Sequence, residues 1–312
     1  MSKLRLLVSL PNQNHYQQAQ ARAAELKGGE LGAEVQILDA NNDAVNQSQQ
    51  LLEVLQSSSG PRPDAILVEP LTSTGLVKVA EAAVAAGVAW VLLNSSADYI
   101  DQLRVKTKLP VFAVTRDHGE IGRIQGSQFE ALLPNGGTVL YIQGPNTSAA
   151  ASQRTIGAES TRPANIQMRG LRSQWTEQSA QAAVSSWLRL STSRPGSIDL
   201  VGCQYDGIAR GARQAFQEIS SAEDRAHWLS LPFTGVDGLA DEGLQWVDRG
   251  ELSATVVAPI TTQVAVEALV KAMLTGTQPP PVTLLDLKSY PSLDKLSELG
   301  KKSAIQGKHL SS

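Results

Sequence analysis

Short apolar runs alternate with alanine-rich segments of helical length through the first third of the chain. The runs are mostly continuous, which is typical of strands that are buried on both faces of a parallel sheet. They read LRLLVSL, VQIL, DAILV, VAWVLL and VFAV. The segments between them that have helical length include Tyr16–Leu31, Val45–Gln56 and Gly75–Ala86. This order of strands and helices predicts a doubly wound, open α/β sheet.

The same alternation restarts after residue 115, with strands expected at TVLYIQ, NIQMRGL, IDLVGC, WLSLPFTGV and SATVV. One helix between them has an apolar stripe with helical spacing, formed by Ala180, Ala183, Val184, Trp187 and Leu188. We expect Thr176 to cap that helix, and Asp206 to cap the helix that follows IDLVGC. A late strand is expected near Leu284–Leu287. With 312 residues, the chain is predicted to form two similar α/β lobes.

Composition and charge narrow the class of protein. Hydrophobic residues make up 42% of the chain and charged residues 18%, as in an ordinary globular protein. The formal charge of −3 argues against nucleic acid as a partner, and no apolar run approaches the roughly 18 residues of a membrane span. The single cysteine, Cys203, is expected to be buried. The first residues show no complete leader, so two locations stay open: a periplasmic protein whose leader is absent, or a cytoplasmic one.

Polar and aromatic side chains gather where the predicted strands end, which is where open parallel sheets bind ligands. The residues at these ends are Asn12–Tyr16, Asp39, Asn41–Asp43, Glu69, Thr72–Thr74, Asn94–Ser96, Asp98, Asn146–Ser148, Arg154, Trp175, Tyr205, Asp206 and Asp237. Their amides, hydroxyls and aromatic rings suit a neutral polyhydroxy ligand. The alternative is that residues such as Asp39, Asn42, Ser73 and Thr147 only cap helices and form turns.

Templates for catalysis do not fit the chain. The four histidines lack the spacing of metal ligands, and no phosphate loop, nucleophile elbow or dinucleotide-binding glycine motif follows a strand. Glu69 could act as a base, but no nucleophile is evident beside it. We therefore expect no catalytic residues, no metal and no cofactor. The tryptophans at 90, 187, 228 and 246 are expected to be core residues.

Several segments, taken in order, resemble the periplasmic sugar-binding proteins of ABC importers, of the ribose/galactose type. They are LDANND, AILVEPLTSTGL, YIQGPNTSAA followed by RTIG, QWTEQSA, QYDGIARGARQAF and FTGVDG. The resemblance covers roughly Leu4 to Leu287. It implies the type I periplasmic-binding-protein fold, which the effector domains of lac-repressor-like regulators share, with two Rossmann-like lobes joined by a three-segment hinge and a ligand held between them.

The resemblance also implies where the lobes begin and end. The N-terminal lobe is expected to comprise residues 1–115 and 260–285, and the C-terminal lobe residues 116–259 and 286–300. The hinge segments are placed near Thr115–Asp117, Val257–Ile260 and Leu284–Lys288. Residues 301–312 are expected to form a frayed polar tail.

Ligand contacts are implied residue by residue. The loop after the first strand places Gln13, Asn14, His15 and Tyr16 at the sugar. Arg154 corresponds to the sugar-binding arginine of the family when one residue is inserted upstream, Trp175 to an aromatic stacking position, and Asp237 to a ligand carboxylate. Asn94, Ser95 and Tyr205 complete the predicted set of ligand-binding residues.

Three departures from the family pattern bear on the ligand. Asn94-Ser95 stands where Asp-Arg is usual, Tyr205 replaces an asparagine between Gln204 and Asp206, and Ala258 replaces a common glutamine. These changes predict a ligand that is less hydroxylated than ribose or glucose, and partly aromatic.

The resulting prediction is a monomeric, non-enzymatic solute-binding protein that delivers a sugar or related polyol to an ABC permease. The alternative is a free-standing sensor that reports sugar occupancy to a signalling partner. A DNA-binding regulator is not favoured, because no helix-turn-helix precedes the first strand. An enzyme on the same two-lobed plan is the third reading.

Overall fold

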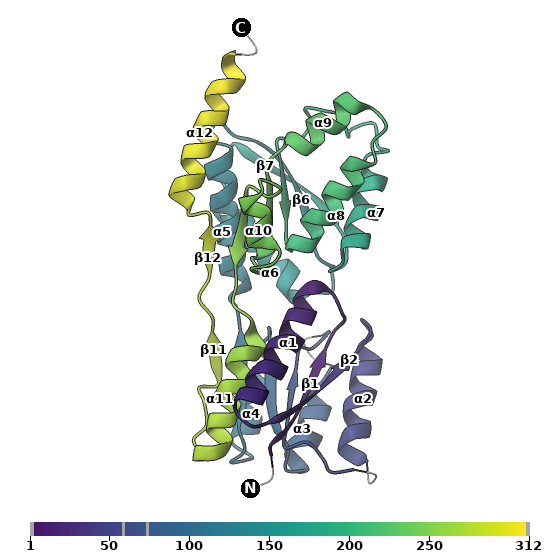
Figure 1. The fold of residues 1–312 in the computed structure, drawn as a ribbon, viewed down its shortest axis with the longest axis vertical. Coiled ribbons are helices and arrows are strands. Elements are labelled where there is room, and N and C mark those ends of the chain that lie inside the picture. The colour runs from purple at the N-terminus through teal and green to yellow at the C-terminus, as the bar shows by residue number, and fades with distance from the viewer. Residues whose placement is uncertain (1–2, 58–59, 73–74, 310–312) are drawn as a thin grey trace. The chain divides into compact units, whose positions relative to one another are not determined.

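A computed structural model describes residues 3–57, 60–72 and 75–309 of the chain, with residues 303–309 described as backbone only. It divides into two units (Figure 1). Unit 1 comprises Met1–Arg116 and Pro259–Leu285, and unit 2 comprises Asp117–Ala258 and Asp286–Ser312. The chain therefore passes between the units at three places, and neither unit is a single stretch of sequence. Ser73 and Thr74, which were considered as cap or ligand residues, lie outside the described residues.

Unit 1 is built on a six-stranded sheet with the strand order β11-β5-β4-β3-β1-β2. All of its pairings are parallel, as the continuous apolar runs predicted. The strands are β1 (Arg5–Leu10), β2 (Glu34–Asp39), β3 (Ala65–Val68), β4 (Ala89–Leu93), β5 (Val111–Thr115) and β11 (Val282–Leu284). The helices are α1 (His15–Glu30), α2 (Ala44–Gln56), α3 (Val77–Ala85), α4 (Tyr99–Arg104) and α11 (Thr261–Thr275).

Two apolar cores cover the two faces of this sheet, which explains why the strands β3 and β4 are apolar at every position. Successive side chains of a strand point to opposite faces. In β4, Trp90 and Leu92 pack into one core together with residues of α2, α3 and α4. Val91 and Leu93 pack into the other core with residues of α1 and α11. Trp90 is fully buried, as predicted, and its Nε1 donates a hydrogen bond of 3.3 Å to the hydroxyl of Tyr99.

Unit 2 repeats the plan with the strand order β12-β10-β9-β8-β6-β7. Only β12 is paired antiparallel among its described pairings. The strands are β6 (Gly137–Gln143), β7 (Ile166–Arg172), β8 (Leu200–Cys203), β9 (Phe233–Asp237), β10 (Ala254–Val257) and β12 (Lys288–Tyr290). The helices are α5 (His118–Leu132), α6 (Ala149–Thr161), α7 (Glu177–Trp187), α8 (Asp206–Gln217), α9 (Ala222–Ser230), α10 (Gly243–Asp248) and α12 (Leu293–His309). The predicted α/β class with two doubly wound parallel sheets is confirmed.

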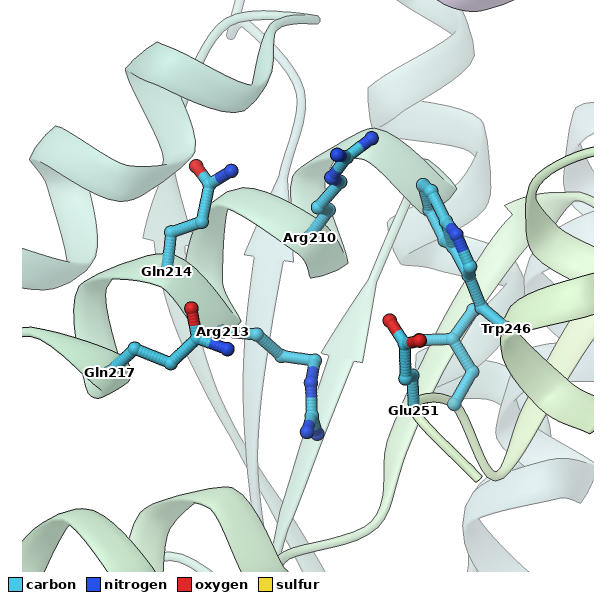
Figure 2. Close-up of a pocket in the computed structure, with 7 residues that line it drawn as sticks. Arg210, Arg213, Gln214, Gln217, Trp246 and Glu251 are labelled. Atoms are coloured by element: carbon cyan, nitrogen blue, oxygen red, sulfur yellow. The ribbon is translucent and has the colours of Figure 1, made fainter. Parts of the chain in front are cut away.

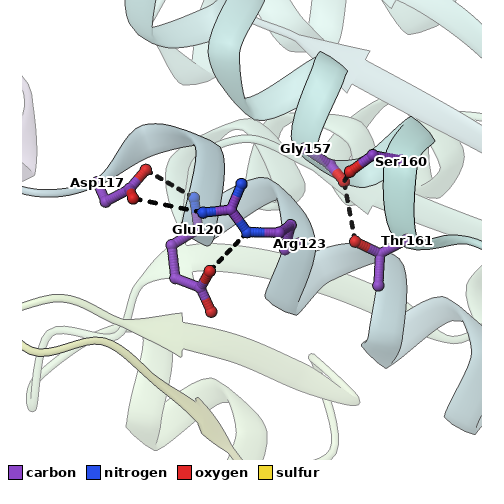
Figure 3. Close-up of polar contacts among 6 residues, drawn as sticks. All are labelled: Asp117, Glu120, Arg123, Gly157, Ser160 and Thr161. Atoms are coloured by element: carbon purple, nitrogen blue, oxygen red, sulfur yellow. Dashed lines mark hydrogen bonds and ion pairs between the residues drawn. The ribbon is translucent and has the colours of Figure 1, made fainter.

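Helices α5 and α6 approach each other closely because glycines face the contact. A Cβ atom added at Gly122 would lie 2.1 Å from the carbonyl oxygen of Arg154, and one at Gly157 would lie 2.1 Å from that of Gly119. At the N-terminus of α5, Asp117 accepts a hydrogen bond from the backbone of Glu120 and pairs with Arg123 at 3.3 Å (Figure 3). Any side chain at Gly122 or Gly157 would force the two helices apart.

Other predictions about the core of unit 2 are confirmed. Cys203 is buried, and its pKa is raised well above the usual value of a thiol by desolvation. Trp228 is buried with its ring stacked on Phe216 at 5.2 Å. Trp187 meets Trp228 edge-on at 5.5 Å but is only half-buried, so it lies at the border of the core rather than inside it. Trp246 is also buried. Thr176 caps α7, since its side-chain oxygen accepts from the backbone N–H of Ser179 at 3.3 Å.

Four sequence predictions about local structure are wrong. Residues 228–230 of the expected strand WLSLPFTGV end helix α9, and the strand begins only at Phe233. The late strand is Val282–Leu284 rather than Leu284–Leu287. Asp206 does not cap α8: it is the first residue inside the helix, and its carboxylate accepts from other segments. Residues 301–309 of the expected frayed tail are instead the last part of helix α12, which packs against α5 where Gly300 meets the backbone of Ala131.

Within residues 3–57, 60–72 and 75–309, none of the helices is long and apolar enough to cross a membrane.

Candidate ligand-binding site

The loop between β1 and α1 is held by hydrogen bonds of its side chains to the backbone nearby and to the loop between β2 and α2. Asn12 donates to the side chain of Asn42 at 2.8 Å and accepts from the backbone of Asn14 at 2.9 Å. Asn14 caps α1 by accepting from the backbone N–H of Gln17 at 2.9 Å. Asn14 therefore has the helix-capping role that is the alternative to contact with a ligand. Gln13 and His15 in the same loop are exposed.

Tyr16 points into unit 1 rather than out of the loop, with only 4% of its surface exposed. Its hydroxyl accepts a hydrogen bond of 3.0 Å from Nδ2 of Asn94, at the end of β4. The guanidinium carbon of Arg116 lies 4.7 Å from the centre of the Tyr16 ring. The structure thus brings together two of the predicted ligand residues, Tyr16 and Asn94, through a contact that links α1 to the end of β4.

Asn94 occupies the left-handed region, with φ of 54°, which asparagine tolerates better than most residues. Its Nδ2 also donates to Oε2 of Glu69 at 3.1 Å, and its Oδ1 accepts from Nε of Arg116 at 2.9 Å. Glu69 accepts a further bond of 3.0 Å from Gln17 through Oε1. Desolvation raises the pKa of Glu69, while the charge of Arg116 and the amide of Asn94 act in the opposite direction.

Arg116 is a member of this cluster that is not predicted from the sequence. Glu69 is among the polar residues expected at strand ends, but it is not in the predicted set of ligand-binding residues. The available signal was position, because each residue directly follows a buried strand, as Asn94 does. Ser95, the remaining predicted residue here, is half-buried.

In unit 2, the structure brings together two of the predicted ligand residues, Arg154 and Trp175. The guanidinium carbon of Arg154 lies 5.5 Å from the centre of the Trp175 ring, a cation–π distance. Arg154 is buried, donates to the carbonyl oxygen of Gln204 and lies 3.4 Å from Nδ1 of His118. Trp175 is half-buried and packs flat against Gly144, where an added Cβ would lie 2.3 Å from its ring.

Gln204 has a structural role that ties β6, β8 and α6 together. Its Oε1 accepts from the backbone N–H of Gly144 at 3.0 Å. Its Nε2 donates to the carbonyl oxygen of Ala151 at 2.9 Å and lies within 3.2 Å of the hydroxyls of Tyr141 and Thr155. Tyr205, next to it, is buried with its ring against Gly207. These contacts fix the segment that precedes α8.

Carboxylates gather at the ends of β8 and β9. Asp206 accepts from the backbone N–H of Gly238 at 2.7 Å and from the hydroxyl of Thr255 at 2.8 Å. Burial, followed by the nearby charge of Asp237, raises the pKa of Asp206 well above its usual value. Asp237 is buried and has φ of 107°. Glu242 is also buried, and its pKa is raised to about 7, first by desolvation and then by the charge of Glu177.

Ala258, which replaces a common glutamine of the family pattern, donates its backbone N–H to the carbonyl oxygen of Asp237 at 3.1 Å. Its methyl group is buried. The position therefore supports the backbone of a predicted ligand residue.

A separate pocket of about 250 Å³ lies on α8 and α10 of unit 2 (Figure 2). Its lining residues are Arg210, Arg213, Gln214, Gln217, Trp246, Glu251 and Leu252. Arg210 lies 5.4 Å from the Trp246 ring and pairs with Glu177 at 3.6 Å, and Arg213 lies 4.9 Å from the Phe233 ring. The arginines are thus engaged with aromatic rings and a carboxylate of unit 2 itself.

Each of the two strand-end clusters has, by itself, chemistry that suits a neutral hydroxylated ligand. The cluster in unit 1 offers a carboxylate, an amide, a phenol and a guanidinium. The cluster in unit 2 offers a guanidinium, an indole and carboxylates. Charged groups of both signs can exchange hydrogen bonds with hydroxyls, and an indole can cover the apolar face of a ring.

Comparison with known sequences gives one family match. Residues 6–278 match the periplasmic binding protein domain. The chain is 26% identical over 231 residues to a putative rhizopine-binding protein of Rhizobium meliloti, covering 72% of this chain and 69% of that protein. It is 27% identical over 239 residues to the ribose import binding protein of Bacillus subtilis, covering 75% and 69%.

Solved structures share the fold. A galactofuranose binding protein matches with a TM-score of 0.76 and 23% identity, over 96% of this chain and 98% of that chain. The fructose binding periplasmic domain of a hybrid two component system matches with a TM-score of 0.74 and 20% identity, over 99% and 98%. At these identities the likeness concerns the fold.

Proposed function

The chain belongs to the family of periplasmic binding protein domains, and from that premise we propose that it captures a sugar or related polyol for an ABC importer. The observation that carries the proposal is the pairing of Arg154 with Trp175, a guanidinium beside an indole at 5.5 Å. This pair combines a donor for hydroxyls with a surface for the C–H face of a sugar ring. The relatives named for rhizopine and ribose binding support a ligand of this class.

The protein acts by binding and release, without chemical change of the ligand. It is exported and works outside the cytoplasm, as the name of its family indicates. Its partners are the solute and an ABC permease that reads the occupied state, and it works as a monomer. Gln13, Asn14, His15, Ser95, Tyr205 and Asp237 are proposed as further ligand contacts.

A second candidate is a sensor that passes sugar occupancy to a signalling protein. The fold of this chain matches that of the fructose binding periplasmic domain of a hybrid two component system, and this match supports a sensor as the second candidate. The two functions differ in the partner and share the ligand. A binding assay with the purified, ligand-bound protein distinguishes the two functions. Binding to a cognate permease supports import, and binding to a histidine kinase supports sensing.

The ligand is sought first with a thermal-shift screen of the full chain. The panel contains D-ribose, D-galactose, D-fructose, myo-inositol, glycerol, D-glucosamine, D-galactosamine and a phenyl glycoside. A ligand that binds only the folded state stabilises it by about 2.7 kcal/mol at a hundredfold excess over its Kd. We expect a clear rise in Tm with one class of sugar or polyol. A chain that shows no shift with any member of the panel would contradict the proposed function.

Mass spectrometry of the mixture after incubation tests whether the ligand is only bound. The recovered ligand should have its original mass. A product that accumulates with time would instead support the enzyme reading.

A further inference from the structure

Three polar residues each directly follow one of three neighbouring strands of unit 1, staggered by one residue from strand to strand. The sheet places β3, β4 and β5 side by side, with β4 in the middle. Glu69 directly follows β3, Asn94 directly follows β4, and Arg116 directly follows β5. A carboxylate, an amide and a guanidinium therefore form a row along the carboxyl edge of the sheet.

The hydrogen bonds along this row determine which residue can occupy its centre. Asn94 accepts from Arg116 on one side at 2.9 Å and donates to Glu69 on the other at 3.1 Å. It also donates to the hydroxyl of Tyr16 at 3.0 Å. An amide has two N–H donors, and these two contacts use both of them. An aspartate at position 94 could still accept from Arg116, but it would place a second carboxylate against Glu69.

Glu69 retains the capacity to bind a ligand within this row. The carboxylate takes one bond on Oε1 from Gln17 and one on Oε2 from Asn94, and the side-chain amide of Gln20 also hydrogen-bonds to it. Two carboxylate oxygens together offer about four acceptor sites. Glu69 is half-buried, so it is neither sealed in the core nor fully solvated. The attraction of Arg116 favours its charged form against the cost of desolvation.

We propose that Glu69 is a ligand-contacting carboxylate that accepts a hydrogen bond from a hydroxyl of a neutral polyol. Asn94 and Arg116 are positioning residues: they hold the carboxylate in place and balance its charge. Since the row carries one negative and one positive group, it gives an amine-bearing ligand little advantage over a neutral one. This inference deepens the proposed function and rests on it.

The experiment exchanges the charge between neighbouring strands. The variants are Glu69→Gln, Asn94→Asp and the double variant carrying both changes, with Glu53→Gln, an exposed position on α2, as the matched control. In the double variant, the new carboxylate at position 94 can accept from Arg116, from the new amide at position 69 and from the hydroxyl of Tyr16. Aspartate tolerates the left-handed backbone of position 94, so the change tests charge rather than strain.

Melting temperatures without ligand test the row itself. We expect Asn94→Asp to lower Tm by several degrees, because it sets two carboxylates side by side, and the double variant to recover most of that loss. Glu53→Gln should leave Tm unchanged. An Asn94→Asp protein that melts like the wild type would overturn the role of Asn94.

Calorimetric titration with the panel member that most stabilises the wild type tests the contact with ligand. We expect Glu69→Gln to weaken affinity by about tenfold to a hundredfold, the usual effect of losing a hydrogen bond to a charged group. The double variant should remain weak, because its carboxylate lies one strand away. Unchanged affinity in Glu69→Gln, or full recovery in the double variant, would show that Glu69 is only structural.

The same data separate the two proposals. If no panel member stabilises the wild type, the proposed function fails and this inference falls with it. If a ligand binds but Glu69→Gln binds it equally well, the function stands and the inference fails. A panel in which D-glucosamine or D-galactosamine gives the largest shift would refute the preference for a neutral ligand.

Discussion

Replacing Gly144 by alanine should disturb ligand binding through Trp175 without unfolding the protein. The indole of Trp175 lies flat over Gly144, and a Cβ added there would meet three ring atoms at 2.3, 2.4 and 2.7 Å. Carbon atoms prefer separations of about 3.5 Å or more. The difference requires the ring to move by about 1.2 Å or more, away from its place beside Arg154.

Moving the ring should lower the affinity for ligand more than it lowers the stability of the folded protein. Trp175 is half-buried, so its ring can swing outward, whereas overpacking a closed core typically costs about 1–3 kcal/mol of folding stability. A displaced indole no longer covers the ligand ring, and its cation–π contact with Arg154 at 5.5 Å weakens. We expect the affinity for the sugar or polyol to fall about tenfold to a hundredfold, or about 1.4–2.7 kcal/mol.

The assay is calorimetric titration of the Gly144→Ala protein, with Tm measured in parallel. Gly29→Ala is the matched control: a Cβ at Gly29 would meet no atom within 4 Å, and alanine in a helix should stabilise slightly. Full affinity in Gly144→Ala together with a large fall in Tm would refute the reasoning. That result would mean that Trp175 is a packing residue and does not contact ligand.

Three further predictions concern unit 2. Asp237→Asn should weaken binding by about 1.5–3 kcal/mol in calorimetric titration if its carboxylate accepts from ligand hydroxyls, and unchanged affinity would remove Asp237 from the site. Gly122→Ala places a methyl group 2.1 Å from the carbonyl oxygen of Arg154, so urea unfolding should show a loss of about 1–3 kcal/mol, and a stability equal to that of the wild type would contradict the tight α5–α6 contact. Because the pKa of Asp206 is raised in the folded state, its ionisation opposes folding as the pH rises above about 4. The Asp206→Asn protein can keep the bonds to Gly238 and Thr255, so its Tm should fall less than that of the wild type as the pH is raised from 4 to 8. If the Tm of the two proteins changes in parallel over this range, Asp206 does not titrate differently in the folded and unfolded states.

The fold was predictable because two-sided burial leaves a strong signal in the sequence. A strand such as β4 has to supply apolar side chains to two cores, so it is apolar without interruption. The prediction failed at residues 228–230, where a short apolar segment is compatible with either a strand or a helix. Residues 228–230 have a strand-like composition, but Trp228 is buried from helix α9 through its stack on Phe216.

The candidate site was only partly predictable, because its contacts join residues that are distant in the sequence. Glu69 and Asn94 are 25 residues apart, and Asn94 and Arg116 are 22 apart. Only the strand order shows that they are neighbours. The sequence also predicts a less hydroxylated ligand from three departures, one of which is the absence of an arginine at position 95. Arg116 places a guanidinium nitrogen 2.9 Å from Asn94, so this cluster contains a guanidinium although position 95 is a serine.

The discontinuous make-up of the two units has a consequence for synthesis on the ribosome. One core of unit 1 needs Val266 and Leu269 of α11, which pack against strand residues such as Val91 and Phe112. These helix residues emerge only after the whole of segment 117–258 has been made. Until then, the nascent first unit exposes an apolar sheet face and lacks the edge strand β11. A fragment that ends at residue 116 should therefore aggregate, and the full-length chain should depend on chaperones that shield that face during translation.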